Sequence, residues 1–206
     1  AVQAKYDVYS PFKNYPGPYP YPASICTSIN DELVHGIPGK RKLKEGDIIS
    51  IDAGTVYQGF VGDMAVTVGV GDVSEQTERL MTVTKQALDI AISKMVPGNT
   101  TGDIGHAVET FVESQGLHIT RTYTGHGVGR KMHEGPQVPN YGKPGRGMRL
   151  REGMTIALEP MVLVGTSHTR VKEDEWTVAS EDGSLTAHYE HTVAVTANGP
   201  EILTLL

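Results

Sequence analysis

The chain has 206 residues, and its 18 Lys and Arg against 24 Asp and Glu give a formal net charge of -6. This acidic balance argues against nucleic acid or an anionic membrane surface as the main partner, because both favour a basic face. Apolar residues make up 38% of the chain, which is typical of a folded protein, and no apolar run is long enough to span a bilayer. A single cysteine and no recognisable signal peptide predict a cytoplasmic location.

The chain opens with a segment rich in tyrosine and proline, which we treat as an N-terminal arm over residues 1–23. Its prolines exclude a helix, because each lacks an N–H donor and forces its predecessor into an extended conformation. An ordered arm over an apolar surface and a flexible tail are both open. The ordered arm is favoured by its aromatic side chains, which are Tyr6, Tyr9, Tyr15, Tyr19 and Tyr21. Residues 24–206 are expected to form one domain.

Two extended segments, residues 47–53 and 60–70, are predicted to form a β-hairpin, because they are rich in Val, Ile and Thr. A tight turn centred on residues 57–58 would place Asp52 directly opposite Asp63. Opposed side chains lie roughly 5 Å apart at Cβ, so two carboxylates there must share a proton or a cation. The alternative is a different register, with both aspartates on a solvated edge.

Two helices are predicted next, over residues 75–95 and 102–115, where apolar residues recur every three or four positions. Ser74 is the expected N-cap of the first helix, and Thr100 with Asp103 forms a capping-box pattern before the second. Further strands are expected over residues 119–123, 155–164, 176–180 and 189–196. This order of elements predicts an α+β domain with a largely antiparallel sheet.

Further side chains suited to metal binding lie beyond the hairpin. His126 is placed between two glycines, and His133 follows seven residues later. Glu159 and Glu190 lie inside apolar predicted strands, where a lone carboxylate would cost several kcal/mol to bury. Each has a structural alternative, such as a loop histidine or an ion pair of Glu159 with Arg170. Together, four carboxylates and one imidazole suit two divalent ions of the Mn, Fe, Co or Zn kind.

Several motifs resemble those of type I methionine aminopeptidase, and they occur in that family's order from about residue 24 to residue 205. They are Ser28–Pro38, Glu45–Asp52, Gly62-Asp63, Thr124–Gly129, His133-Glu134, Leu158–Met161 and Tyr189–Thr192. The resemblance implies the pita-bread fold, with the helix pair of its first half absent. Residues 24–206 would then be the metallopeptidase catalytic domain.

The resemblance also implies a site. Its five metal ligands would be Asp52, Asp63, His126, Glu159 and Glu190, holding two divalent ions (Co, Mn, Fe or Zn). A water activated by these ions would attack the first peptide bond, while His133 steadies the oxyanion and Glu159 passes a proton to the leaving amine. His35 would contact the backbone after that bond, and the methionine side chain would fill a pocket of Tyr21, Cys26, Met132 and Trp176.

The implied substrate is the N-terminus of a peptide or nascent protein, with the ribosome as a candidate partner. Family members are expected to be monomers. Two other functions compete with this one. The first is an Xaa-Pro aminopeptidase or prolidase, which shares the five ligands. The second is a catalytically silent pita-bread protein that acts as a binding module, although such proteins typically lose metal ligands.

Three departures from the family pattern carry expectations of their own. Without the first helix pair, the arm or another chain would have to cover an apolar surface, so association is open. Pro18 stands where the family usually has a pocket tyrosine, for which Tyr15 or Tyr19 could compensate. Met132 replaces the more usual aromatic residue, which affects the expected selectivity of the pocket but not the hydrolytic machinery.

Overall fold

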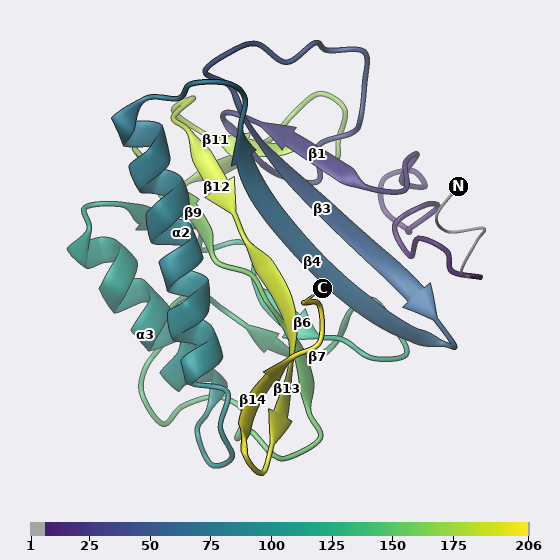
Figure 1. The fold of residues 1–206 in the computed structure, drawn as a ribbon, viewed down its shortest axis with the longest axis vertical. Coiled ribbons are helices and arrows are strands. Elements are labelled where there is room, and N and C mark those ends of the chain that lie inside the picture. Colours follow the sequence, from purple (N-terminus) through teal and green to yellow (C-terminus); the bar gives the residue numbers. More distant parts are fainter. Residues whose placement is uncertain (1–6, 206) are drawn as a thin grey trace.

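The structure, a computed structural model, describes residues 7–205 (Figure 1), so Tyr6 of the predicted arm lies outside it. Within this range the chain forms two helices and three antiparallel sheets. The largest sheet has the strand order β1-β3-β4-β13-β8-β6-β7, with β14 paired to β13. The predicted α+β class with a largely antiparallel sheet is confirmed.

The elements have the following bounds. The helices are α2 (Glu75–Ser93) and α3 (Thr101–Ser114). The strands are β1 (Cys26–Ile29), β2 (Glu32–Val34), β3 (Ile48–Tyr57), β4 (Phe60–Gly69), β5 (His118–Ile119), β6 (Gly125–Gly127), β7 (Glu134–Val138), β8 (Thr155–Leu158), β9 (Met161–Leu163), β10 (Thr169–Val171), β11 (Val178–Ser180), β12 (Thr186–His188), β13 (Glu190–Thr196) and β14 (Gly199–Ile202).

Both helices begin at the predicted caps. The Ser74 hydroxyl accepts a hydrogen bond from the Thr77 N–H at 3.2 Å. At the start of α3, the Thr100 hydroxyl accepts from the Asp103 N–H, and the Asp103 carboxylate accepts from the Thr100 N–H at 2.7 Å. Each cap pairs a donor that the first helical turn leaves unsatisfied. Neither helix of the described range is long and apolar enough to cross a membrane.

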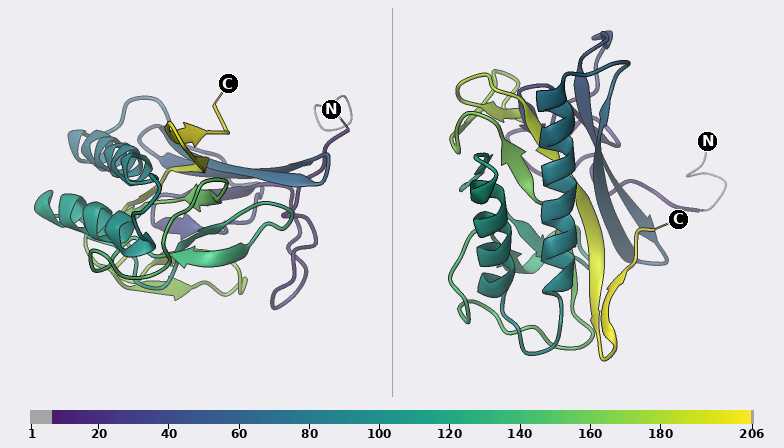
Figure 2. Two further views of the ribbon diagram at one scale, coloured as in Figure 1. Left: turned by 90° about the horizontal axis from the view of Figure 1, so that it is seen from below. Right: turned by 60° about the vertical axis from the view of Figure 1, so that its left-hand side comes forward.

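The two helices lie side by side and cover one half of the molecule (Figure 2). Their apolar faces, represented by Leu80 and Ile104, share a core with Ile156, Val162 and Val193 of the sheets. All five side chains are at most 1% exposed. Fully burying such a side chain contributes about 1.5–3 kcal/mol, so this half holds the main hydrophobic core.

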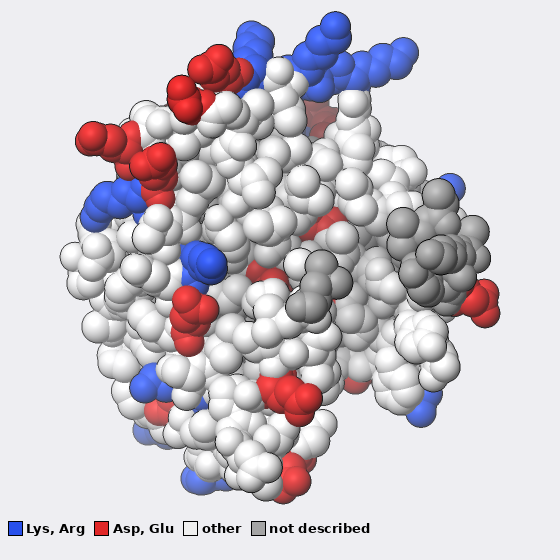
Figure 3. Space-filling model, viewed as in Figure 1, with Lys and Arg blue, Asp and Glu red and all other residues white. Residues whose placement is uncertain are grey.

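The other half of the large sheet presents an outer face that neither helix covers (Figures 1 and 2). Successive side chains along a strand point to opposite faces, and the residues of this outer face alternate with Asp52 and Asp63, which therefore lie on the inner face. The outer face holds the cross-strand pairs Ile51–Val66 and Ala53–Met64, all partly exposed, and Val68, which is 41% exposed. Figure 3 shows few charged side chains over β3 and β4, whereas Lys and Arg gather near the β2–β3 connection.

The arm is ordered over residues 7–23 and packs on the inner face of β3. The backbone of Tyr9 forms an isolated bridge with Val56. A Cβ built on Gly54, which faces inward, would lie 2.7 Å from the Pro11 side chain. The expectation that the arm covers the surface that a first helix pair would bury is therefore wrong for residues 7–23, because they cover the opposite face.

The hairpin of β3 and β4 is present, but its turn differs from the prediction. Tyr57 pairs with Phe60, so the two turn residues are Gln58 and Gly59. Their φ angles are 49° and 81°. Two positive φ angles define the type I′ turn, whose twist matches that of paired strands. Gln58 adopts this left-handed conformation although Asn or Gly is the usual residue there, which is why the turn was predicted one residue too early.

The shifted turn changes how the two aspartates face each other. Asp52 pairs with Ala65, and Asp63 pairs with Gly54. The prediction that the two carboxylates are directly opposed is therefore wrong, and they are diagonal neighbours. The register differs from the predicted one by two residues, and a shift of two keeps every side chain on its original face. Both aspartates therefore still point to the inner side of the sheet.

One strand that is predicted as continuous is divided between sheets, because the segment 155–164 is interrupted by Glu159 and Pro160. The predicted strand over 189–196 is present as β13, and the separate strand β12 precedes it. β8 and β13 belong to the large sheet, whereas β9 and β12 pair in a small one. Proline cannot donate to a ladder, which explains the interruption of 155–164. Both glutamates thus lie where the chain passes from one sheet to the other.

Candidate metal centre

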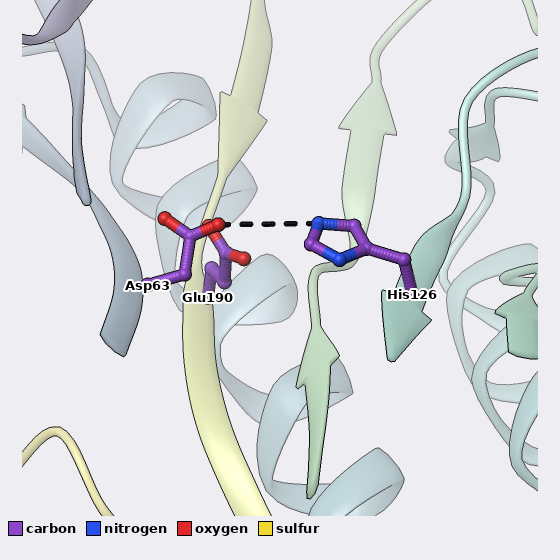
Figure 4. Close-up of side chains that lie close together, drawn as sticks. All are labelled: Asp63, His126 and Glu190. Carbon is purple, nitrogen blue, oxygen red and sulfur yellow. Dashed lines mark ion pairs between the residues drawn. The ribbon is translucent and has the colours of Figure 1, made fainter. Parts of the chain in front are cut away.

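Five neighbouring strands of the large sheet direct one metal-ligating type of side chain each into one cavity. In sheet order these side chains are Asp52 on β3, Asp63 on β4, Glu190 on β13, Glu159 directly after β8, and His126 on β6. Figure 4 shows Asp63 and Glu190 side by side, with His126 reaching toward them from the other side. Because each strand is hydrogen-bonded to the next, the sheet itself fixes the spacing of the five groups.

The ligand atoms are close enough to surround a cation. One ligand atom from each of Asp63, His126 and Glu190 lies within 4.8 Å of the others. Nε2 of His126 is 3.9 Å from Oδ2 of Asp63 and 3.5 Å from Oε1 of Glu159. The alternative ion pair of Glu159 with Arg170 does not form, because the Arg170 guanidinium instead lies 3.7 Å from Asp31.

The carboxylates are buried without enough partners. Asp63 and Glu190 are each 2% exposed. Oδ1 of Asp52, Oδ1 of Asp63 and Oε1 of Glu190 have no hydrogen-bond partner among the described residues. A buried polar atom without a partner costs about 1–3 kcal/mol, and more when charged. A divalent cation is the partner that fits several such oxygens at once, so the donor set suits a metal centre.

Burial also shifts the ionisation of these carboxyl groups. Burial raises the pKa of Asp63 to about 7. Burial and the charge of Asp63 raise the pKa values of Asp52, Glu159 and Glu190 well above their ordinary range. Without a cation, the cavity therefore favours carboxyl groups that share protons, and a bound cation would favour their ionised forms.

His126 presents the form of imidazole that a metal requires. Burial lowers its pKa to about 4, so the ring is neutral at pH 7. Its Nδ1 lies 2.9 Å from the Gly127 carbonyl oxygen, which can only accept, so Nδ1 carries the proton. Nε2 then keeps its lone pair and faces the carboxylates. A Cβ at Gly127 would lie 2.2 Å from the Gly135 carbonyl oxygen, so a larger residue would push β6 away from β7.

A threonine holds the strand that carries Asp63. The Thr192 hydroxyl accepts a hydrogen bond from the Asp63 N–H at 2.9 Å and donates one to the Asp63 carbonyl oxygen at 2.9 Å. These bonds link β4 to β13 where their regular pairing has ended. They fix the backbone of one candidate ligand, Asp63, against the strand that carries another, Glu190.

Two other predicted histidines border the cavity. The rings of His133 and His126 have centroids 4.2 Å apart. The Tyr15 hydroxyl lies 2.6 Å from Nδ1 of His133, and because burial raises the pKa of Tyr15 that hydroxyl stays protonated and can donate. Nε2 of His133 then carries the ring proton and is the ring's donor. His35 follows β2 with a φ of 61°, a strained backbone angle of the kind common at functional sites.

An apolar pocket adjoins the candidate metal ligands in a cavity of about 130 Å³. All eleven predicted site residues line it, namely Tyr21, Cys26, His35, Asp52, Asp63, His126, Met132, His133, Glu159, Trp176 and Glu190. Trp176 stands edge-on to Tyr21, with ring centroids 5.1 Å apart, and its Nε1–H donates to the Tyr19 carbonyl oxygen. The arm therefore forms one wall of the pocket.

Sequence reasoning missed three side chains of this cavity, which are Phe12, Val34 and His188. Tyr15 was considered only as a substitute for the tyrosine absent at Pro18, and it does line the cavity, unlike Tyr19. His188 had a recognisable signal, because it stands two residues before Glu190 in an extended segment and so faces the same side. The other two are ordinary apolar residues without a signal of their own.

Comparison with known proteins assigns the chain to a family. The profile of metallopeptidase family M24 matches residues 2–197. Methionine aminopeptidase of Clostridium acetobutylicum is 52% identical over 202 residues, which are 98% of this chain and 80% of that protein. The chain belongs to the type I methionine aminopeptidases of family M24. The crystal structure of the Thermotoga maritima methionine aminopeptidase agrees, with a TM-score of 0.96, 50% identity, and coverage of 100% of this chain and 82% of that one.

Membership of this family confirms the pita-bread fold and identifies the chain as a metal-dependent aminopeptidase. The X-Pro aminopeptidase of Thermotoga maritima has a TM-score of 0.70 at 22% identity, and this chain covers 47% of it. That likeness extends to the fold alone. The methionine aminopeptidases match at about twice that identity, so neither the Xaa-Pro peptidase nor the silent binding module is favoured.

Proposed function

We propose that the chain removes N-terminal methionine from peptides and nascent proteins at the cavity described above, using two divalent cations. The convergence of four carboxylates, two buried and two partly buried, and a neutral imidazole beside an apolar pocket carries this proposal. The ligands would be Asp52, Asp63, His126, Glu159 and Glu190. When bound, such cations supply a water of lowered pKa and polarise the scissile carbonyl.

The chain's own residues account for the proton movements. Glu159 lies between Glu190 and His126 in the order of the sheet, with Oε1 3.5 Å from Nε2 of His126. It is suited to take a proton from the attacking water and pass it to the leaving amine. His133, whose Nδ1 is engaged by Tyr15, presents its Nε2–H to the developing oxyanion. His35 borders the same cavity and would hydrogen-bond the backbone after the cleaved bond.

Selectivity for methionine follows from the apolar side of the cavity. Tyr21, Cys26 and Met132 are at most 7% exposed and belong to one apolar cluster, against which Trp176 packs. Such walls suit an unbranched thioether, and the sulfur of Met132 adapts to one better than a rigid ring would. Because the arm closes this side, the cavity accepts a chain end more readily than the middle of a chain.

The test is peptide hydrolysis by chelator-treated protein with and without added Mn²⁺ or Co²⁺. We expect metal-dependent release of methionine from Met-Ala-Ser and no cleavage of Leu-Pro-Ala. Cleavage of the proline peptide alone, or no cleavage of either by a folded and metal-loaded protein, would overturn the proposal. The cytoplasmic location, contact with the ribosome and the monomeric state remain predictions, and the uncovered face of β3 and β4 makes gel filtration the measurement for the last of these.

A further inference from the structure

A second imidazole lies in the cavity in addition to the five proposed ligands. His188, the last residue of β12, is 1% exposed, and its two ring nitrogens have no hydrogen-bond partner among the described residues. An unpaired buried imidazole costs about 1–3 kcal/mol. Its side chain lines the same cavity as the carboxylates, so its partner has to be sought there.

The geometry relates His188 to Glu159. Nε2 of His188 lies 3.5 Å from Oε2 of Glu159, and Nε2 of His126 lies 3.5 Å from Oε1 of the same carboxylate. The two imidazoles therefore flank Glu159, one at each oxygen. His188 also faces Glu190, with 4.0 Å between Nε2 and Oε2. His188 therefore lies between the side chains of Glu159 and Glu190.

We propose that His188 is a positioning residue, whose Nε2–H donates to Oε2 of Glu159 and so leaves Oε1 aimed at the metal. This inference rests on the proposed function, because Glu159 has to be a metal ligand for its orientation to matter. Carboxylates that bind metals are commonly held by such hydrogen bonds, and removing the partner typically weakens metal affinity about 10–100-fold.

A role of His188 as a sixth ligand is less consistent with the distances. Nε2 of His188 approaches Oε2 of Glu159, whereas Nε2 of His126, a proposed ligand, approaches Oε1 of the same carboxylate. A donor at Oε2 holds the carboxylate without taking a coordination position.

Two variants separate these roles. His188→Gln keeps an N–H donor at a similar distance from the backbone, whereas His188→Leu keeps an apolar side chain of similar size and removes the donor. His191→Gln is the matched control, because His191 lies on the same strand as Glu190, and its Nδ1 pairs with the Thr204 hydroxyl instead of facing the cavity. Each protein is stripped with a chelator and titrated with Mn²⁺ by calorimetry, and its Co²⁺ absorption spectrum is recorded.

We expect His188→Leu to bind one cation at least about 10-fold more weakly, and His188→Gln and His191→Gln to stay within about 3-fold of wild type. The metal-free leucine variant should still fold, because leucine is an apolar side chain of similar size, and circular dichroism checks this. Wild-type affinity in His188→Leu would overturn the proposal. A changed Co²⁺ spectrum in the glutamine variant would also overturn it, in favour of direct ligation. Both readouts are independent of peptide cleavage, so they remain decisive if the proposed activity fails.

Discussion

The metal-free protein is expected to lose stability as the pH rises, which is unusual for a chain rich in carboxylates. Burial raises the pKa of Asp63 from 3.8 to about 7. A group whose pKa is higher in the folded state stabilises the fold at low pH, and this contribution is lost as the pH rises through the folded-state value. Between pH 5.5 and 8, Asp63 alone then removes about 2 kcal/mol. The raised pKa values of Asp52, Glu159 and Glu190 act in the same direction.

A loss of about 2 kcal/mol in stability is large enough to measure by thermal unfolding. A domain of this size has a total stability of about 5–15 kcal/mol, and 1 kcal/mol corresponds to about 2–4 °C in Tm. We therefore expect the Tm of chelator-treated protein to fall by at least about 4–8 °C between pH 5.5 and pH 8. Circular dichroism measures it, with Asp63→Asn as the matched variant that cannot titrate.

Added Mn²⁺ should abolish this fall in Tm, because ions bind the ionised carboxylates most tightly at the higher pH. Asp63→Asn should show a smaller fall than wild type. A metal-free wild-type Tm that is constant or rises from pH 5.5 to 8 would refute the reasoning. It would mean that the carboxylates find partners in solution that the structure does not contain.

Three further substitutions test single contacts. Tyr15→Phe removes the hydroxyl beside His133, and at about 1 kcal/mol for a neutral hydrogen bond kcat/KM should fall about fivefold, while Tyr19→Phe should leave it unchanged. Thr192→Val removes both hydrogen bonds that hold the β4 aspartate and should weaken Mn²⁺ binding about 10-fold in calorimetry, so unchanged binding would contradict the role given to this hydroxyl. Thr100→Ala breaks the capping box and should lower stability by about 1 kcal/mol in a urea titration, with hydrolysis unaffected.

Local signals in the sequence predicted the helices well, because a cap is a contact between near neighbours. Ser74 and Thr100 bond to backbone groups three residues away, and that spacing can be read directly from the sequence. The hairpin was harder, because its register depends on one backbone angle at Gln58. The prediction was two residues wrong in register and still right about the face, since only an odd shift exchanges the faces of a strand.

In the candidate site too, residues in local sequence motifs could be predicted, whereas contacts between distant residues could not. Asp52, His126 and Glu190 stand in motifs whose pattern could be recognised, and the structure brings them into one cavity with the rest of the predicted set. Their catalytic roles are still predictions. The contacts of Tyr15 with His133 and of His188 with Glu159 could not be predicted, because they join residues 118 and 29 positions apart in the chain. No local pattern encodes such distances.

The order of strands in the large sheet has a consequence for how the protein is synthesised. β13 is formed late in the chain, yet it lies in the middle of the sheet between β4 and β8. Glu190 and Thr192 are part of this strand, so about 130 residues must be added after the proposed ligands Asp52 and Asp63 before the proposed centre can be complete. Contacts of such long range are slow to form. The proposed centre therefore cannot be complete in a growing chain until β13 has been synthesised, so metal loading should follow the pairing of β13 with β4 and β8.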